Sequence, residues 1–170
     1  MLTSIVKAKY FILATIFLLQ ANIYLKSEDL AIEIDNPRFS EKGLNDKVYE
    51  IKAKKGLKFD NKLELFEVEG KFKTEKNGKW IYLVADTGSF IQITNCIELH
   101  KNIIFYTEEG EIVKSNHASF DMNDDVIKLR ENVSHESSKG LILSDDSIIT
   151  DNFNKIKYSG NVVSILKSSN

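Results

Sequence analysis

The side chains that could do chemistry in this sequence are three histidines, three pairs of adjacent acidic residues and one cysteine. His100, His117 and His135 show neither an i, i+2 nor an i, i+4 spacing, and no cysteine stands close to them in a ligand pattern. Zinc sites rely on such short spacings. The histidines therefore predict no metal centre, and His135 fits a partly buried position in a strand.

The acidic pairs are Glu108-Glu109, Asp124-Asp125 and Asp145-Asp146. Glycosidases need two carboxyl groups facing one bond, so an anchored glycan hydrolase is one interpretation of these pairs. All three pairs fall in or beside expected turns, where acidic side chains are commonly solvated. The sequence also lacks Gly-x-Ser-x-Gly, Gly-x-x-x-x-Gly-Lys and Gly-x-Gly-x-x-Gly motifs. We therefore expect no enzymatic activity and no cofactor.

Composition narrows the remaining classes of partner. Cys96 is the single cysteine in 170 residues, which rules out an internal disulfide, and its alternation with Ile97 predicts a strand residue rather than a catalytic thiol. The formal net charge is −2, with lysines and glutamates interspersed. Nucleic-acid binding needs a broad positive field, so nucleic acid is not an expected partner.

The elements that must position these side chains are short strands. Apolar and polar residues alternate along most of the chain after the amino terminus, as in Tyr49, Ile51 and Ala53, and no long helical periodicity follows residue 30. Turn signals such as Asn77-Gly78 and Glu109-Gly110 separate the runs. The pattern predicts an all-β, largely antiparallel domain, because the long crossovers of a parallel α/β sheet are missing.

Within this β region the chain repeats itself about every thirty residues. The pairs Asn102-Ile103, Asn132-Val133 and Asn161-Val162 mark the three copies. The same offsets align four columns of residues: Leu83, Val113 and Leu143; Phe90, Phe120 and Ile149; Ile97, Ile127 and Ile156; Leu99, Leu129 and Tyr158. With three or four strands expected in each unit, stacking gives an elongated sandwich or a jelly roll. A parallel β-helix is the alternative, which the hairpin turn signals disfavour.

The alternation gathers apolar side chains on one face of the expected sheets. They either pack as a solid core or, if the sheets stand apart, line a trough that could hold acyl chains. The residues in question are Phe90, Ile97, Leu99, Ile103, Phe105, Phe120, Ile127, Leu129 and Val133. The third copy breaks step by one residue and has Ser164 where the earlier copies have Phe105 and His135, so we expect the apolar lining to thin towards the last strand.

The two ends of the array are expected to be open edges. The first strand, about Leu30 to Phe39, is interrupted by Pro37, and the last, about Asn161 to Lys167, contains an uncharged Val-Val-Ser-Ile-Leu run. An unprotected edge strand can accept a strand from a partner, or it can simply be covered by the chain terminus.

The amino terminus has a different character. Residues Tyr10 to Leu25 carry no charge and are mostly apolar, with Lys7 and Lys9 on one side and Lys26 on the other. We expect residues 1–29 to form a cytoplasmic amino terminus and an uncleaved transmembrane helix, and residues 30–170 to form a translocated domain. A cleaved signal peptide is the alternative, but no small-x-small cleavage pattern follows the apolar stretch.

The expected anchor is followed by Ile34-Asp35-Asn36-Pro37-Arg38-Phe39-Ser40 and by Tyr49-Glu50-Ile51-Lys52-Ala53. Further along stand Ala85-Asp86-Thr87-Gly88, Leu99-His100-Lys101-Asn102-Ile103 and Ser159-Gly160-Asn161-Val162. In their order and spacing these segments resemble the LptC family, the membrane-anchored bridge of lipopolysaccharide export within the LptA/LptC/OstA-like superfamily. The resemblance covers essentially the whole chain.

The resemblance implies a twisted antiparallel β-jelly roll in the periplasm, attached to the inner membrane by a single-pass helix. Such a domain binds lipopolysaccharide acyl chains in an apolar groove during outer membrane biogenesis. Its transporter-side edge would meet LptF and LptG of the inner-membrane ABC transporter through Ile32, Ile34, Asn36, Pro37 and Phe39. Its far edge would meet LptA through Asn161, Val162, Val163, Ser164, Ile165 and Leu166. An anchored scaffold that uses only its edges and carries no lipid is the alternative.

Overall fold

The structure is a computed structural model that describes residues 31–42, 48–73, 78–124, 126–151 and 153–167. The expected cytoplasmic segment and transmembrane anchor, residues 1–29, lie outside these ranges. The strands described below all belong to one compact unit, Ala31–Asn170. Within the described ranges, the structure contains no helix with the length and apolar character needed to cross a membrane.

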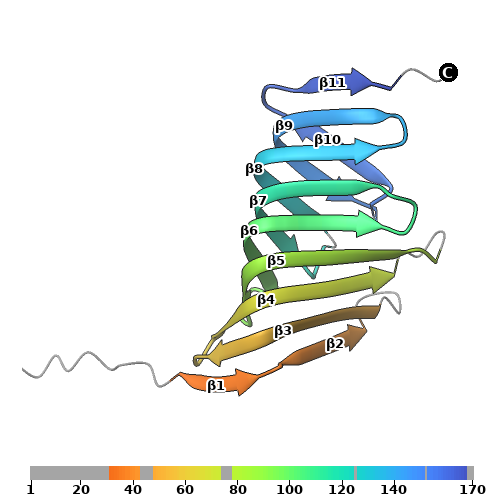
Figure 1. The fold of residues 1–170 in the computed structure, drawn as a ribbon. Coiled ribbons are helices and arrows are strands. Elements are labelled where there is room, and N and C mark those ends of the chain that lie inside the picture. The colour runs from red at the N-terminus through yellow and green to blue at the C-terminus, as the bar shows by residue number, and fades with distance from the viewer. Residues whose placement is uncertain (1–30, 43–47, 74–77, 125, 152, 168–170) are drawn as a thin grey trace, which may run out of the picture. The chain divides into compact units, whose positions relative to one another are not determined.

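The described part of the chain forms one open antiparallel sheet of eleven strands (Figure 1). The strands are β1 Ile32–Asp35, β2 Arg38–Lys42, β3 Val48–Lys58, β4 Lys62–Lys73, β5 Trp80–Ile91, β6 Cys96–Thr107, β7 Ile112–Asp121, β8 Val126–Ser137, β9 Gly140–Thr150, β10 Lys155–Ser159 and β11 Val163–Leu166. Their order is β1-β3-β4-β5-β6-β7-β8-β9-β10, while β2 also pairs with β3 and β11 also pairs with β9. The all-β, antiparallel prediction is confirmed, and the parallel β-helix alternative is wrong.

Each long strand bends near its middle. The pairing register shifts between His100 and Ile103 in β6 and between Arg130 and Val133 in β8, and the residues in these gaps have positive φ angles. Such β-bulges bend a strand and increase its twist. The sheet therefore folds over, and its two halves face each other across one interior (Figure 1). Tyr49 of one half, for example, lies 5.5 Å from Phe120 of the other, measured between ring centroids.

We call the two halves arm A and arm B. Arm A comprises residues 38–42, 48–53, 68–73, 80–85, 103–107, 112–115, 133–137, 140–144 and 163–166. Arm B comprises residues 32–35, 55–58, 62–66, 87–91, 96–100, 117–121, 126–130, 146–150 and 155–159. At the two ends of the sheet the arms are separate strands: β2 and β11 belong to arm A, and β1 and β10 to arm B.

The thirty-residue repeat marks these corners. Asn102 and Asn132 have φ angles of 49° and 58°, and Asn161, between β10 and β11, has a φ of 37°. Asn is among the few residues that tolerate this left-handed region. The Asn102 amide donates a hydrogen bond of 2.9 Å to Asp86, and the Asn161 amide donates one of 2.8 Å to Asp145. Asn102 and Asn161 thus brace one strand against the next at the bend.

One expectation about the repeat is wrong. Thirty residues in the middle of the array form two long bent strands, such as β6 and β7, rather than three or four short ones, and the third copy ends in the two short strands β10 and β11. The alternation of apolar and polar residues loses its phase at the corner, because the bulge inserts extra residues there without ending the pairing. In the sequence this loss of phase resembles a turn.

The core lies between the two arms. It is a single cluster of buried apolar side chains, in which Ile103 and Leu129 have no exposed surface and Phe105 is 3% exposed. Phe153, in the turn after β9, closes part of it by lying 5.5 Å from Phe105 and 5.3 Å from Phe72 between ring centroids. The same side chains therefore hold the arms together and fill the space between them.

The corner geometry predicts a difference between two substitutions at Asn102. We expect Asn102→Val to lower the free energy of unfolding by about 2 kcal/mol, because a β-branched residue at positive φ is strained and the bond to Asp86 is lost. Asn102→Gly keeps the favourable φ and should cost no more than about 1 kcal/mol. Urea unfolding of the full chain in detergent measures both, and equal losses would contradict a role for the backbone conformation.

Candidate binding interior and open edges

The inner face of the sheet is organised as rows of side chains that run across the strands. In arm A one row passes through Leu83, Phe105 and Val113, and then continues through His135, Ile142 and Ser164. In arm B the facing row passes through Leu99, Ala118 and Leu129 before it reaches Ser147 and Tyr158. Both rows are apolar in the middle of the sheet and become polar near β10 and β11.

The structure brings together all nine residues that the sequence predicts to line a lipid trough. Seven of them are buried, whereas Phe90 and Phe120 are partly buried and pack against the same cluster. Their shared position follows from the register, since Phe90, Ile97, Phe120 and Ile127 are successive cross-strand neighbours in arm B. Leu143, which the repeat aligns with Leu83 and Val113, is 39% exposed, and Ile142 takes the place beside His135. The one-residue shift of the third copy therefore falls earlier in the chain than the repeat pattern predicts.

The interior is closely packed in this conformation. The apolar cavity between Leu83, Phe105 and Phe120 has a volume of only about 30 Å³, and a second hollow beside Phe39 and Met122 has about 80 Å³. Sites that enclose drug-sized ligands usually measure about 300–1,000 Å³. An acyl chain can enter this interior only if the arms move apart or the rows repack.

A larger pocket of about 340 Å³ lies at the end of the interior near β11. Its lining mixes the polar side chains of His135, Tyr158 and Ser164 with those of Ile142 and Leu166. The apolar lining thins here, as the sequence predicts. In the repeat, Tyr158 stands only as the third member of the Leu99 and Leu129 column, and nothing in the sequence pairs it with His135.

His135 and Tyr158 join the two arms at this pocket. The hydroxyl group of Tyr158 and Nδ1 of His135 form a hydrogen bond, and the two rings stack with centroids 6.2 Å apart. Partial burial lowers the pKa of His135 and raises the pKa of Tyr158, because both charged forms lose hydration. Both neutral side chains are therefore favoured. Nε2 of His135 and Oγ of Ser147 are buried with no partner among the described residues.

The first edge of the sheet consists of β1 and β2 on either side of a corner at Asn36 and Pro37. The backbone N–H of Asn36 donates to the carbonyl of Lys54, and the carbonyl of Pro37 accepts from Ala53, so the corner is held on β3. Ile32 is 62% exposed, and Phe39 is 39% exposed. Of the five residues assigned to the transporter side, Ile34 is partly buried and Pro37 is buried, so these two support the edge from within.

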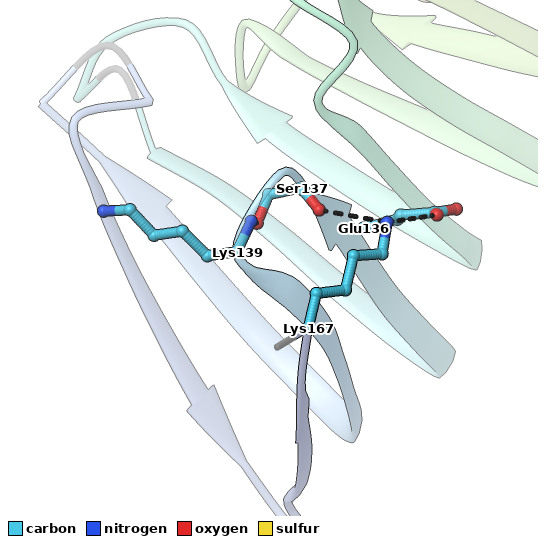
Figure 2. Close-up of polar contacts among 4 residues, drawn as sticks. All are labelled: Glu136, Ser137, Lys139 and Lys167. Atoms are coloured by element: carbon cyan, nitrogen blue, oxygen red, sulfur yellow. Dashed lines mark hydrogen bonds and ion pairs between the residues drawn. The ribbon is translucent and has the colours of Figure 1, made fainter. Parts of the chain in front are cut away.

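The far edge is β11, which pairs with β9 along one side only. Val163, Ile165 and Leu166 are 50%, 53% and 80% exposed. Figure 2 shows how the end of this strand is fixed: the Lys167 ammonium lies 3.2 Å from a Glu136 carboxylate oxygen and donates a second bond to the Ser137 carbonyl. The backbone N–H of Lys167 also donates to the carbonyl of Lys139. The expected open strand at this end is therefore present.

Three of the acidic side chains in the adjacent pairs, Glu108, Glu109 and Asp145, are engaged in local contacts. The Glu109 carboxylate lies 2.7 Å from the Lys79 ammonium, which lowers the pKa of Glu109, and Glu108 accepts a bond from the Tyr82 hydroxyl. Asp145 and Asp146 lie at the corner of β9 and not in a turn, so that part of the turn assignment is wrong.

The two histidines outside the interior, His100 and His117, lie beside each other and beside Glu98. His117 Nε2 lies 3.0 Å from a Glu98 carboxylate oxygen, and the rings of His100 and His117 are 4.8 Å apart. In the part of the chain that the structure describes, no three histidine, cysteine or acidic side chains are arranged to hold a metal ion.

A scan against protein-family models and a search of curated proteins both find no match for this chain. A functional proposal for this chain therefore rests on the geometry of the interior and its edges and on the resemblance of the sequence segments.

The lowered pKa of His135 predicts a loss of stability in acid. Between the pKa of the unfolded chain, about 6.5, and the lower folded value, the unfolded chain binds a proton that the folded protein does not, so the free energy of unfolding falls as the pH drops. We expect His135→Phe to weaken this dependence between about pH 7.5 and about pH 5, whereas His100→Gln, an exposed control, leaves it in place. Urea midpoints at each pH measure it, and an unchanged slope in His135→Phe would contradict the assignment.

The attachment of β11 depends on Gly140. A Cβ atom at this position would lie 2.1 Å from the carbonyl oxygen of Ile165, so Gly140→Ala must push β11 away from β9. We expect faster hydrogen exchange of the Val163–Leu166 amides in this variant. Gly110→Ala is the matched control, because Gly110 also has a positive φ but has no atom within 4 Å of the added Cβ. Equal exchange in the two variants would show that β11 does not depend on this contact.

Proposed function

We propose that this protein is an LptC-like, single-pass component of the inner membrane whose β-jelly roll carries the acyl chains of lipopolysaccharide. The observation that carries the proposal is the combination of one apolar interior between the arms with an open edge at each end of the same sheet. An interior that ends in two uncapped edges can be extended by neighbouring sheets of the same kind, whereas a closed barrel cannot.

The two edges give the proposed path a direction. With residues 1–29 as the membrane anchor, β1 and β2 stand next in the chain and would meet the β-domains of LptF and LptG. The other end, β11, would receive a strand of LptA by β-augmentation, in which main-chain hydrogen bonds supply affinity. Lipopolysaccharide would then move from the transporter, across the interior between the arms, to LptA on its way to the outer membrane.

The physical gain is the shielding of acyl chains from water. Each CH₂ group that leaves water for an apolar environment contributes about 0.8 kcal/mol, so several chains together represent a large free energy. Arms that separate around such chains exchange their own contacts for contacts with lipid. The sequence has no phosphate-binding loop, which is consistent with the ABC transporter supplying the energy.

A second candidate function is that of an anchored scaffold, which joins β-domains through its edges and carries no lipid. The small cavity of about 30 Å³ in the middle of the interior favours it. The two candidates differ in one measurable property, which is whether lipid ever contacts the inner rows.

Photo-crosslinking separates the two candidates. A photoreactive amino acid replaces Phe120 on the inner face or Lys128 on the exposed outer face of the full chain, in inner-membrane vesicles that contain lipopolysaccharide and an active transporter. We expect a lipopolysaccharide adduct at Phe120 and none at Lys128. Phe120 is partly buried, so the label disturbs the core less than one at Leu129 would. Absence of an adduct at Phe120, with edge contacts to partners intact, would favour the scaffold.

A further inference from the structure

His135 and Tyr158 line the pocket beside β11, and in the rows that cross the strands they come after the apolar residues of the interior. The small cavity of that interior is lined by Leu83, Phe105 and Phe120 among others, and none of the residues that line it lines the 340 Å³ pocket. Since His135 belongs to arm A and Tyr158 to arm B, their contact joins the two arms where the apolar rows give way to the pocket.

The chemistry of this pair differs from that of the other contacts between the arms. Tyr49 of arm A, for example, packs on Phe120 of arm B, with ring centroids 5.5 Å apart. Apolar side chains of this kind can slide past an acyl chain and exchange one apolar neighbour for another. A hydrogen bond between two neutral polar groups has to break before an apolar chain can pass, and both groups then need other partners.

The His135–Tyr158 pair leaves nearby polar atoms buried without hydrogen-bond partners, which apolar packing at the same position would not do. In the preceding repeat the position of His135 is occupied by Phe105, which is 3% exposed and needs no partner. His135 instead leaves Nε2 buried without a partner among the described residues, and Ser147, the cross-strand neighbour of Tyr158, leaves Oγ in the same state. Buried polar atoms without partners are uncommon in folded proteins, so those that persist call for an explanation.

We propose that His135 and Tyr158 form a gate that closes the far end of the interior and must open for an acyl chain to pass from the apolar rows to the pocket beside β11. This inference rests on the proposed transport function. With the hydrogen bond formed, the apolar rows between the arms end at the polar side chains of His135 and Tyr158. With the pair parted, Phe105, Val113, Ile142 and Leu166 form a longer apolar path, and the polar groups of His135, Ser147 and Tyr158 are free to bond with the polar part of the passing lipid.

The charged groups around the pair are compatible with such a gate. Glu111 lies close enough to influence both side chains, since its negative charge opposes the loss of a proton from either one. Lys139 lines the same pocket from the hairpin between β8 and β9. At neutral pH both members of the pair are uncharged, so the gate closes through a hydrogen bond and not through an ion pair that salt would weaken.

Locking the gate tests the proposal directly. In a Cys96→Ser background, His135→Cys and Tyr158→Cys are introduced together in the full chain and joined by a short bis-maleimide. A photoreactive residue at Phe120 reports lipopolysaccharide before the gate, and one at Leu166 reports it beyond the gate. The experiment uses inner-membrane vesicles with lipopolysaccharide and active transporter. The control carries His135→Cys alone, modified with a maleimide that adds bulk without joining the arms.

We expect the joined protein to keep its adduct at Phe120 and to lose the adduct at Leu166, while the control forms both. Adducts at both positions in the joined protein would overturn the gate and leave the transport function standing. Absence of an adduct at Phe120 even in the unjoined protein would remove the transport function, and the gate with it. Loss of the Leu166 adduct in the control as well would show that bulk at this position is sufficient, which also overturns a gate made by joining the arms.

A second pair of variants tests the gate without a crosslink. His135→Phe combined with Tyr158→Phe removes the hydrogen bond but keeps two rings, and Tyr49→Phe makes the matching change at another contact between the arms. We expect the adduct at Leu166 to form faster in the first variant than in the second or in the unaltered chain. Equal rates in all three would overturn the proposal. Far-ultraviolet circular dichroism confirms that each variant is folded before the rates are compared.

Discussion

The bend in the middle of each strand is the constraint on which the rest of this structure depends. A flat sheet of eleven strands would expose one apolar face to water, and no helix in the described part of the chain is available to cover it. Positive φ angles at Lys101 and Asn102 in β6, and at Glu131 and Asn132 in β8, turn the sheet on itself, so each arm buries the inner face of the other. The core forms because neighbouring strands bend at adjacent positions, so that the bend runs across the whole sheet.

The same bend explains why the ends of the sheet remain open. A folded sheet that does not close into a barrel keeps two edges, and at both of them the edge consists of two short strands, β1 with β2 and β10 with β11. At each end the corner residues Asn36 and Asn161 separate the members of the pair. Each pair leaves its outer side without a strand neighbour in the described sheet. Exposed edges of this kind are a hazard in an isolated protein, so a partner at each edge fits their persistence.

The polarity of the inner-face side chains changes from the middle of the sheet to the end near β10 and β11. The rows are apolar from Leu83 to Val113 in arm A and from Leu99 to Leu129 in arm B, and they are polar at His135, Ser147, Tyr158 and Ser164. A core that served packing alone would gain from apolar residues throughout. The polar end faces the strand that is proposed to meet LptA, where a lipid would leave the protein.

Strand content, antiparallel pairing, most turns and the membership of the inner face could all be predicted from the sequence, because alternation and turn residues act over a few positions. Phe90, Ile97, Phe120 and Ile127 could be grouped on that basis alone. The folded chain was needed to show that the repeating asparagines are corners within long strands, that Ile142 and not Leu143 faces inward, and that His135 meets Tyr158. These outcomes depend on register shifts at the bulges and on the meeting of two arms, and a side chain more than twenty residues away in the chain leaves no local trace of such a contact.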